Sequence, residues 1–434
     1  MSHDLTDAVE GPSGWRSLVV DLTPLRVNPV FRRLYVARIV SFVGSMITFV
    51  ALPAQMFAIT GSSLQVGMIG LVELVPLVGA ALFGGALADR IDRKGLVVGC
   101  EFGMAGSTAL LAWNGTLGNA GHVWILYVFA AVAAVFDGLQ RPAIEALNQQ
   151  ILRREHLTAA NALGSSLFSF GMILGPVIGG VIIATWGFGW AFGIDAVSFI
   201  MGGTLALTLP SRRAARDPDA IPESPFADIR EGLCYAWANK ALLGSYLVDI
   251  NAMVFGMPLA LFPAMARDLG GASTLGWLYA GPGIGSLLMS VFGAGIPRRV
   301  ARHGVGLLFA AAGWGVAIAV FGLVHTPWLA VVLLAVAGAA DMLSGLFRMA
   351  MWNFSIPNEI RGRLAGIEMI SYSASPPLGN VESGLIAAVT SVRTSVVSGG
   401  VLCVAVGGLL AIALPDLRAY TAREAIRVGT EQRG

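Results

Sequence analysis

The sequence predicts an all-α membrane protein whose twelve transmembrane helices form two pseudo-symmetric six-helix bundles. The chain of 434 residues is 56% hydrophobic and only 12% charged, and its mean hydropathy is +0.73. A soluble domain carries roughly twice that charged fraction because water must wet its surface, so most of this surface must face lipid. The length suits about twelve helices of about 20 residues each. The 55 glycines agree, because small residues let membrane helices approach closely.

Twelve apolar spans follow one another along the chain. Six precede a polar segment, at about 32–60, 64–88, 94–113, 122–150, 158–185 and 190–209. Six follow it, at about 241–266, 275–297, 304–325, 327–353, 362–389 and 392–414. The predicted domains are therefore a cytoplasmic N-terminal segment (1–30), an N-terminal six-helix bundle (31–210), a cytoplasmic linker (211–239), a C-terminal six-helix bundle (240–415) and a cytoplasmic tail (416–434). The linker is rich in proline and charge, and its last part, Phe226 to Trp237, is expected to form an amphipathic helix on the membrane surface.

The positive charges predict the orientation of these spans. With the N-terminus inside, 23 of the 28 Lys and Arg residues lie in inner segments and two, Arg267 and Arg393, lie in outer loops. Cationic loops resist translocation, so this bias indicates that both termini are cytoplasmic. The first residues are polar and acidic, and we expect no cleaved signal peptide. The excess of Arg over Lys, 26 to 2, and the abundance of Ala and Gly suggest a GC-rich bacterial genome and hence the bacterial cytoplasmic membrane.

The two halves of the chain resemble each other. Asp137 lies near the middle of the fourth span and Asp341 near the middle of the tenth. Arg141 and Arg348 follow them, one or two turns further toward the cytoplasm. Parallel halves related by an axis along the membrane normal are typical of one transporter architecture.

The loop between the second and third spans carries a motif, Gly85-x-x-x-Asp89-Arg90-x-x-Arg93-Lys94. The glycine permits close helix contact, the aspartate can interact with a helix N-terminus, and the basic residues can pair with carboxylates at an inner gate. An ordinary basic inner loop would explain a lone Asp-Arg pair, but it does not explain the full spacing of the motif.

The fifth span contains a second motif, Gly171-x-x-x-Gly175-Pro176-x-x-Gly179-Gly180. Four glycines at helical spacing make a smooth face, while the proline removes a backbone donor and is expected to kink the helix. A generic small-residue packing face is the alternative reading of this motif.

The loop motif closely resembles the signature of the major facilitator superfamily, and the glycine motif resembles one associated with its exporters that exchange substrate for protons. Further strings resemble the drug:proton antiporter branch that includes the enterobactin exporter and Tap-type multidrug efflux pumps: Phe31-Arg32, Ala37-Arg38, Pro53-x-Gln55, Gln65-Val66-Gly67, Ala159-Ala160-Asn161-Ala162 and Ile360-Arg361-Gly362-Arg363. The resemblance implies alternating access powered by a proton gradient, with no cofactor. Many drug antiporters carry Arg-x-x-Gln-Gly in the fourth span, whereas here Pro142 and Ala143 follow Arg141, so no relay role is carried over to that arginine.

Charged residues inside the spans are the candidates for coupling, because a charge in the bilayer is expensive and marks function or pairing. The resemblance implies that spans one, four, seven and ten line a central cavity. The proton-coupling candidates are Glu73, Asp137, Asp249 and Asp341, and the candidates for cavity charge and pairing are Arg38, Arg141, Arg348 and Glu382.

Simpler explanations stand beside these assignments. Asp137 and Arg141 lie four residues apart and can neutralise each other, and Glu101 and Asp195 fall on spans where a structural role is expected. Glu73 has no cation three or four residues away, so it can exchange protons near neutrality. Arg348 or Arg38 could reach across to Asp249 or Asp341.

Substrate recognition is predicted to use an aromatic and Met-rich interior, because such surfaces tolerate varied ligands. The candidates are Phe42, Met46, Gln55, Phe255, Met257, Met349, Trp352 and Tyr372. Lipid-facing or core packing is the alternative for each of them.

The predicted function is secondary active export of small amphipathic molecules, either drugs (conferring drug resistance) or a siderophore-like metabolite, by proton antiport. The alternatives are a dedicated siderophore or metabolite exporter without drug activity, uptake or passive exchange, and, least favoured, a membrane sensor that has lost transport. No enzyme and no metal site is expected, because the five histidines are scattered and the three cysteines lack metal spacing. The expected partners are the lipid bilayer, the substrate and protons, without nucleic acid, and the chain is expected to act as a monomer.

Overall fold

The computed structural model describes residues 21–90, 92–210, 234–235, 237, 239–356 and 361–421, without the side chains of residues 81–90, 154, 354, 361–363 and 365–372. The predicted surface helix at Phe226–Trp237 lies almost wholly outside these residues. The described residues form helices joined by short connections.

Six long helices make up the N-terminal bundle: α2 (Pro29–Thr60), α3 (Ser63–Arg90), α4 (Arg93–Thr116), α5 (Val123–Ile151), α6 (Arg154–Trp186) and α7 (Phe188–Leu207). The C-terminal bundle contains α9 (Lys240–Phe255), α10 (Phe262–Leu269), α11 (Ala272–Phe292), α13 (His303–Leu323), α14 (Pro327–Ser355), α15 (Arg361–Val389) and α16 (Val392–Ala413). Short helices α1 (Thr23–Val27), α12 (Ile296–Arg299) and α17 (Pro415–Ala419) and the 3₁₀ turns η2 (Gly118–Ala120) and η3 (Leu259–Leu261) complete the described elements.

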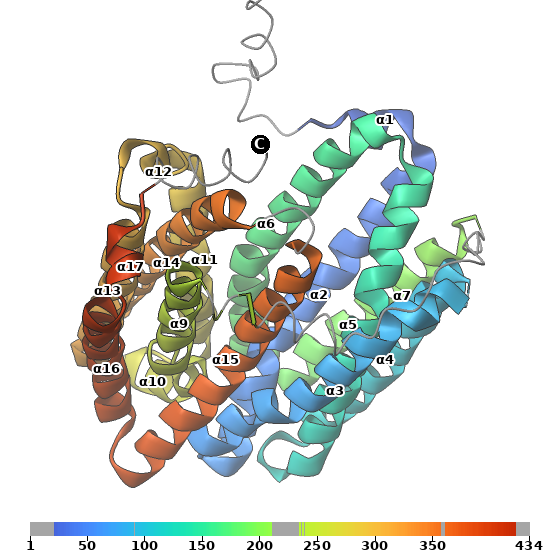
Figure 1. Cartoon of the computed structure of the whole chain (residues 1–434). Coiled ribbons are helices and arrows are strands. Elements are labelled where there is room, and N and C mark those ends of the chain that lie inside the picture. The colour runs from blue at the N-terminus through green and yellow to red at the C-terminus, as the bar shows by residue number, and fades with distance from the viewer. Residues whose placement is uncertain are drawn as a thin grey trace, which may run out of the picture.

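Eleven segments of the described residues are long and apolar enough to cross a membrane. The twelfth predicted span corresponds to α15, whose 29 residues include Pro376, Pro377, Asn380 and Glu382, a more polar helix than the rest. Its length exceeds the about 20 residues that span a bilayer, and it packs against α3 and α9 (Figure 1). The fold is therefore the predicted two-bundle membrane fold.

The predicted continuous span at 241–266 is wrong in one respect, because the chain breaks inside it. The helix α9 ends at Phe255, Gly256 caps it, and η3 precedes α10. Pro258 causes this break in part, because its ring removes a backbone donor and disfavours a helical conformation before it. Pro176, in contrast, does not break its helix, because α6 continues without interruption through this residue.

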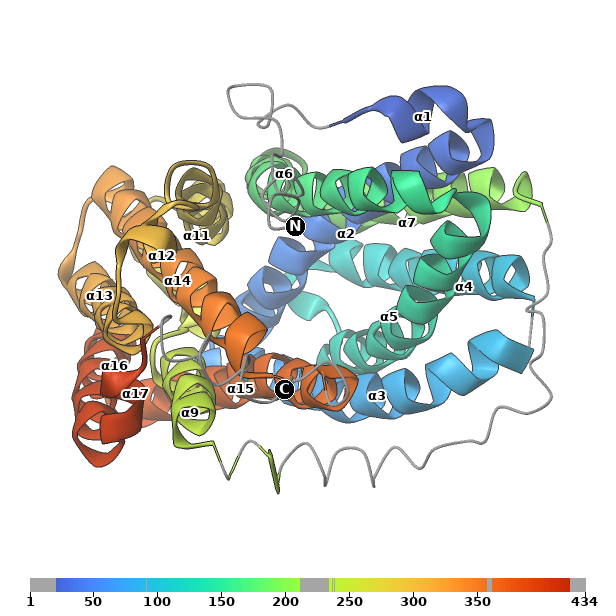
Figure 2. The same ribbon diagram turned by 45° about the horizontal axis from the view of Figure 1, so that its top comes forward.

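The two bundles lie side by side and contact each other through two pairs of helices, α3 with α15 and α6 with α11 (Figure 2). Helix α2 also contacts α10 and α11. Figure 1 shows that the ribbons of the two bundles spread apart toward the end of the molecule that carries α1, α12 and α17. We call this end the α1 end and the opposite one, which carries α10, the far end.

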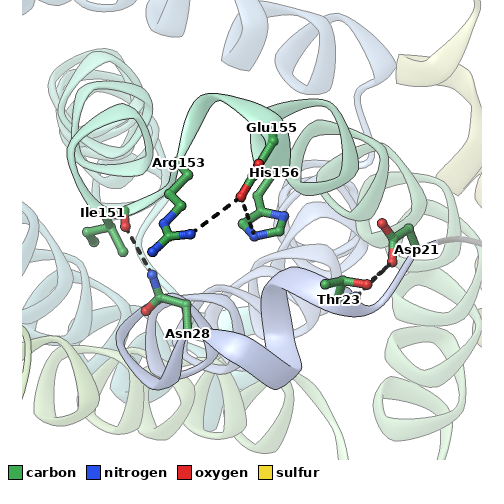
Figure 3. Close-up of polar contacts among 7 residues, drawn as sticks. All are labelled: Asp21, Thr23, Asn28, Ile151, Arg153, Glu155 and His156. Carbon is green, nitrogen blue, oxygen red and sulfur yellow. Dashed lines mark hydrogen bonds and ion pairs between the residues drawn. The ribbon is translucent and has the colours of Figure 1, made fainter.

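Polar side chains tie the helix termini together at the α1 end (Figure 3). Asn28 caps α2 through its side-chain oxygen, and its Nδ2 donates to the carbonyl oxygen of Ile151 at 3.0 Å. Glu155 lies 3.7 Å from Arg153 and 3.6 Å from the Nε2 atom of His156. The Asn28 hydrogen bond joins the beginning of α2 to the end of α5, while the Glu155 contacts are local to the start of α6.

Basic side chains gather at the α1 end. Among the described cations outside the helix interiors, Arg267 and Arg393 alone lie at the far end, where the Nη1 atom of Arg393 donates to the carbonyl oxygens of Gly322 and Val324 at the end of α13. This separation is the one that the charge count predicts for a membrane-spanning chain.

Candidate functional site

A buried charge cluster joins α9 to α14 in the C-terminal bundle. Arg348 forms an ion pair with Asp249, and the side chains of the two residues are only 17% and 10% exposed. Asp341 lies two turns before Arg348 on α14 and within electrostatic range of both partners. One arginine therefore faces two carboxyl groups, and the two groups can compete for it.

Aromatic side chains close one side of this cluster. The Arg348 guanidinium lies over the Trp352 ring, 5.8 Å from its centroid. The Trp352 indole donates to the Ser245 hydroxyl at 3.2 Å and packs against Tyr246 with the ring centroids 5.1 Å apart. A cation over an aromatic face is attracted to it, so these contacts fix where the guanidinium lies.

A more open cluster occupies the N-terminal bundle. The Nε atom of Arg141 lies 3.0 Å from Asp137, and the two side chains are 68% and 48% exposed. Glu73 on α3 lies within electrostatic range of Asp137, and Arg38 on α2 lies within range of Arg141. No ion pair joins Glu73 or Arg38 to another side chain in the described part of the chain.

The glycine motif of α6 packs against α2. A Cβ atom at Gly171 would overlap the Phe42 ring, one at Gly175 would overlap the Cβ of Met46, and one at Gly179 would lie 3.2 Å from the Cα of Ile47. These glycines allow α2 to approach so closely that its side chains contact the backbone of α6.

The same motif also reaches the other bundle. A Cβ at Gly180 would lie 2.8 Å from the Cα of Gly276 on α11, and one at Gly276 would overlap the carbonyl oxygen of Pro176. The motif therefore forms part of the contact between the two bundles, in addition to its contact with α2.

Other contacts between the bundles lie in the far half of the molecule. A Cβ at Gly67 on α3 would overlap the carbonyl oxygen of Asn380 on α15. The rings of Phe49 and Tyr279 meet edge to face at 5.3 Å. The guanidinium of Arg267 on α10 lies 5.4 Å from the ring centroid of Phe57 on α2.

The sequence did not single out Asn380, which holds the break in the seventh span. Its Oδ1 atom accepts a hydrogen bond from the Ala260 amide in η3 at 3.0 Å. An asparagine in an apolar span after two prolines was the available signal, because a polar amide in a membrane helix needs a partner.

The loop motif is only partly described. Gly85, Asp89 and Arg90 lie at the end of α3, and their side chains fall outside the described residues. The Nη1 atom of Arg93 donates to the carbonyl oxygen of Ala146 on α5 at 3.3 Å. Lys94 is partly buried in the first turn of α4.

The predicted substrate residues do not form one group. Phe255 and Met257 are partly buried against the main core, Trp352 belongs to the charge cluster, and Met349 is 58% exposed. The Gln55 side chain is fully buried and donates to the carbonyl oxygen of Asn114 at 3.2 Å. The side chain of Tyr372 lies outside the described residues, and Glu382 is a partly buried member of α15.

The sequence matches one family over nearly its whole length. A family described as transmembrane secretion effector, in the major facilitator group, matches residues 19–428. Enterobactin exporter EntS of Shigella boydii is 30% identical over 421 residues, a match that covers 93% of this chain and 96% of the relative. Enterobactin exporter EntS of Escherichia coli O1:K1 is 29% identical with the same coverage.

Solved transporters share the fold. A crystal structure of a mutant of the nucleoside transporter NupG has a TM-score of 0.70 at 13% identity, covering 89% of this chain and 99% of that one. A bacterial homologue of the human lysosomal transporter Spinster, crystallised in an inward-facing and unoccupied conformation, has a TM-score of 0.62 at 17% identity, covering 93% and 98%. The likeness establishes the two-bundle architecture of a major facilitator.

Proposed function

Because this chain belongs to the transmembrane secretion effector family of the major facilitator superfamily, we propose that it exports a small amphipathic molecule across the bacterial cytoplasmic membrane in exchange for protons. The proposal uses the proton gradient as the energy source and no cofactor. It places the α1 end and both termini in the cytoplasm, on the side where the positive-inside rule puts the basic residues.

The observation that carries the proton-coupling proposal is the cluster of Asp249, Asp341 and Arg348. A buried carboxylate needs its cation, since an unpaired buried charge costs several kcal/mol. A proton that neutralises Asp249 removes the electrostatic attraction between Arg348 and α9. The guanidinium can then turn to Asp341. Because Asp341 and Arg348 both lie on α14, proton binding at Asp249 releases the ion pair that links α9 to α14.

The contacts between the bundles supply the second half of this mechanism. In the described state they lie in the far half, through Gly67, Gly276 and the Phe49–Tyr279 rings. With the α1 end cytoplasmic, this is a state closed toward the outside. Export requires these contacts to separate, and the motif glycines of α6 present a surface without side chains on which neighbouring helices can slide.

The proposed substrate class is a siderophore-like metabolite. Its support is the similarity to relatives named enterobactin exporters over 93% of this chain. Broader drug efflux is the second candidate, supported by the resemblance of the loop motif and of the α6 glycine motif to those of drug:proton antiporters.

The test is export from bacterial cells that lack their own enterobactin exporter. Cells expressing this chain should release more enterobactin than cells with the empty vector, and a protonophore should abolish the difference. Accumulation of a fluorescent cationic dye in the same cells tests the drug candidate. Export that persists in the presence of the protonophore would exclude proton antiport and favour passive exchange.

Single neutral replacements separate the coupling candidates. Asp249→Asn and Asp341→Asn should abolish proton-driven export, whereas Glu382→Gln, on α15 outside the cluster, should retain most of it. If Asn or Gln at Glu73, Asp137, Asp249 and Asp341 each left proton-driven export intact, the coupling mechanism would be wrong.

A further inference from the structure

Two carboxyl groups inside the N-terminal bundle take no part in the clusters described above. Glu101 on α4 is 6% exposed and Asp195 on α7 is 1% exposed. Neither forms an ion pair with Lys, Arg or His among the residues that the structure describes. A buried carboxylate without a cation is unfavourable, so each of these groups needs another explanation.

Glu101 joins three helices through hydrogen bonds. The Ser41 hydroxyl on α2 donates to its Oε2 atom at 2.7 Å, and the Gln140 amide on α5 donates to its Oε1 atom at 2.8 Å. An amide N–H can only donate, whereas a serine hydroxyl can donate or accept. The Oε2 atom is therefore the position where Glu101 can carry a proton and keep both partners.

The neighbouring helix leaves room for this arrangement. A Cβ atom at Gly202 on α7 would lie 2.6 Å from Oε2 of Glu101 and would overlap the Ser41 hydroxyl. The glycine thus allows a carboxyl and a hydroxyl group to fill the space between α2, α4 and α7. This fit holds the Glu101 side chain at one position against α2.

We propose that Glu101 is a proton-binding site outside the central charge clusters, and that its proton controls how α2 is held through Ser41. With the proton on Oε2, the carboxyl group donates to the Ser41 hydroxyl. When the proton leaves, the hydroxyl donates to the carboxylate, and this charge-assisted bond is shorter and stronger. The role in transport rests on the proposed function, whereas proton binding by Glu101 does not.

Helix α2 transmits this change because its other contacts lie beside Ser41. The next residue, Phe42, packs on Gly171 of the glycine motif, and Arg38 lies one turn before it. A tighter bond at Ser41 draws α2 toward α4 and away from α6. Proton occupancy at Glu101 therefore biases the contact between α2 and the glycine motif.

The groups around Glu101 include no cation that binds it in the described part of the chain. Asp195 on α7 lies within electrostatic range, and the Cys100 thiol adjoins it on α4. The charged groups on the other nearby helices form no ion pair with Glu101: Asp137, Arg141 and Glu145 on α5, Arg32, Arg33 and Arg38 on α2, and Glu73 on α3.

Asp195 provides a matched control. Its carboxyl group is also buried and accepts from an α2 hydroxyl, Thr48, at 2.5 Å, but its second donor is Ser198 of its own helix at 3.2 Å. No described hydrogen bond joins it to α5. Removal of this acid therefore tests the loss of a buried carboxyl group without the link between α2 and α5.

The experiment is infrared difference spectroscopy of the purified full-length protein across a pH titration. The wild type should show a protonated-carboxyl C=O band that disappears as the pH rises. Other buried acids contribute to the same spectral region, so Glu101→Gln should remove one component of this band and Asp195→Asn should keep that component. Ser41→Ala should shift the frequency of the component because the hydroxyl partner is lost. A titrating band that is the same in the wild type and Glu101→Gln would overturn the proposal.

Export assays then separate this site from the proposed function. Glu101→Gln should keep measurable export but lose part of its dependence on pH. If the Glu101 band titrates but export is insensitive to protonophore, Glu101 is a proton-binding site and the proton-antiport proposal is wrong. If export depends on the proton gradient but no Glu101 band titrates, proton antiport is supported and the Glu101 proposal is wrong. If gel filtration shows that Glu101→Gln does not fold, Ser41→Ala carries the test, and an unshifted band in that variant would contradict the proposal.

Discussion

Replacement of Asp249 by asparagine tests whether the buried pair with Arg348 matters more than the exposed pair between Asp137 and Arg141. The side chains of Asp249 and Arg348 are 10% and 17% exposed. Asp249→Asn therefore removes the carboxylate that the buried guanidinium contacts and leaves it only Asp341, two turns away on its own helix. The removal of one partner from a buried pair costs about 3–5 kcal/mol. Asp137 and Arg141 are 48% and 68% exposed, and an exposed pair contributes only about 0–1 kcal/mol.

The assay is thermal unfolding of the detergent-solubilised protein, in which gel filtration with fluorescence detection measures the folded fraction after heating. At about 2–4 °C per kcal/mol for a unit the size of one bundle, Asp249→Asn should lower the apparent Tm by at least about 6 °C. Asp137→Asn should lower it by no more than about 4 °C. The double variant Asp249→Asn, Arg348→Met should recover most of the loss, because no buried guanidinium is then left without its ion-pair partner and Asp341 can bind a proton. Equal effects of Asp249→Asn and Asp137→Asn, or no recovery in the double variant, would refute the reasoning.

Two glycine replacements test the contacts of α6 and of the bundle interface. Gly175→Val should cost about 1–3 kcal/mol of stability by overpacking against Met46 and should impair export. Gly164→Ala, on the same helix with nothing within 4 Å of the new methyl group, should behave as wild type. Equal Tm and equal export for the two variants would count against the packing role of Gly175. Gly67→Val should separate the bundles at the far end by overlapping a carbonyl of α15, so a cysteine at the start of α3 should react faster with an impermeant maleimide. Gly79→Ala, which meets nothing within 4 Å, is the control, and unchanged labelling of the Gly67 variant would argue against closure at that end.

The sequence predicted the helices well because each span is a local property of the chain. Eleven of the predicted spans agree with single helices to within a few residues. The exception, at 241–266, depends on Pro258 and on the amide of Asn380, about 120 residues away in sequence. Hydropathy alone does not reveal a break that a distant side chain stabilises.

The partners of the site residues were harder to predict. The pairing of Asp137 with Arg141 follows from their spacing on one helix, but Asp249 and Arg348 meet only because α9 packs against α14. Likewise, the glycine motif indicates a close helix contact without naming Met46 as the side chain that fills it. The sequence named Arg348 or Arg38 as possible partners of Asp249 or Asp341, and the structure confirms one of these pairs, Arg348 with Asp249. Tertiary packing decides which pair forms, and the spacing of residues along one helix does not determine it.

The proposed role of Glu101 shows the same limit. A buried acid on the third span fits a structural role when only its own span is considered. Its hydrogen bonds to Ser41 and Gln140 come from spans one and four, and together they show a group that can gain or lose a proton without losing a partner.

The most direct test of proton-coupled export uses everted membrane vesicles from cells that express the chain. Respiration acidifies the vesicle interior, and a pH-sensitive dye follows the gradient while ethidium or enterobactin is added. Antiport predicts that an accepted substrate enters the vesicle and dissipates part of the pH gradient, and that vesicles with Asp249→Asn show neither effect. Substrate entry that leaves the pH gradient unchanged would contradict proton exchange as the driving reaction.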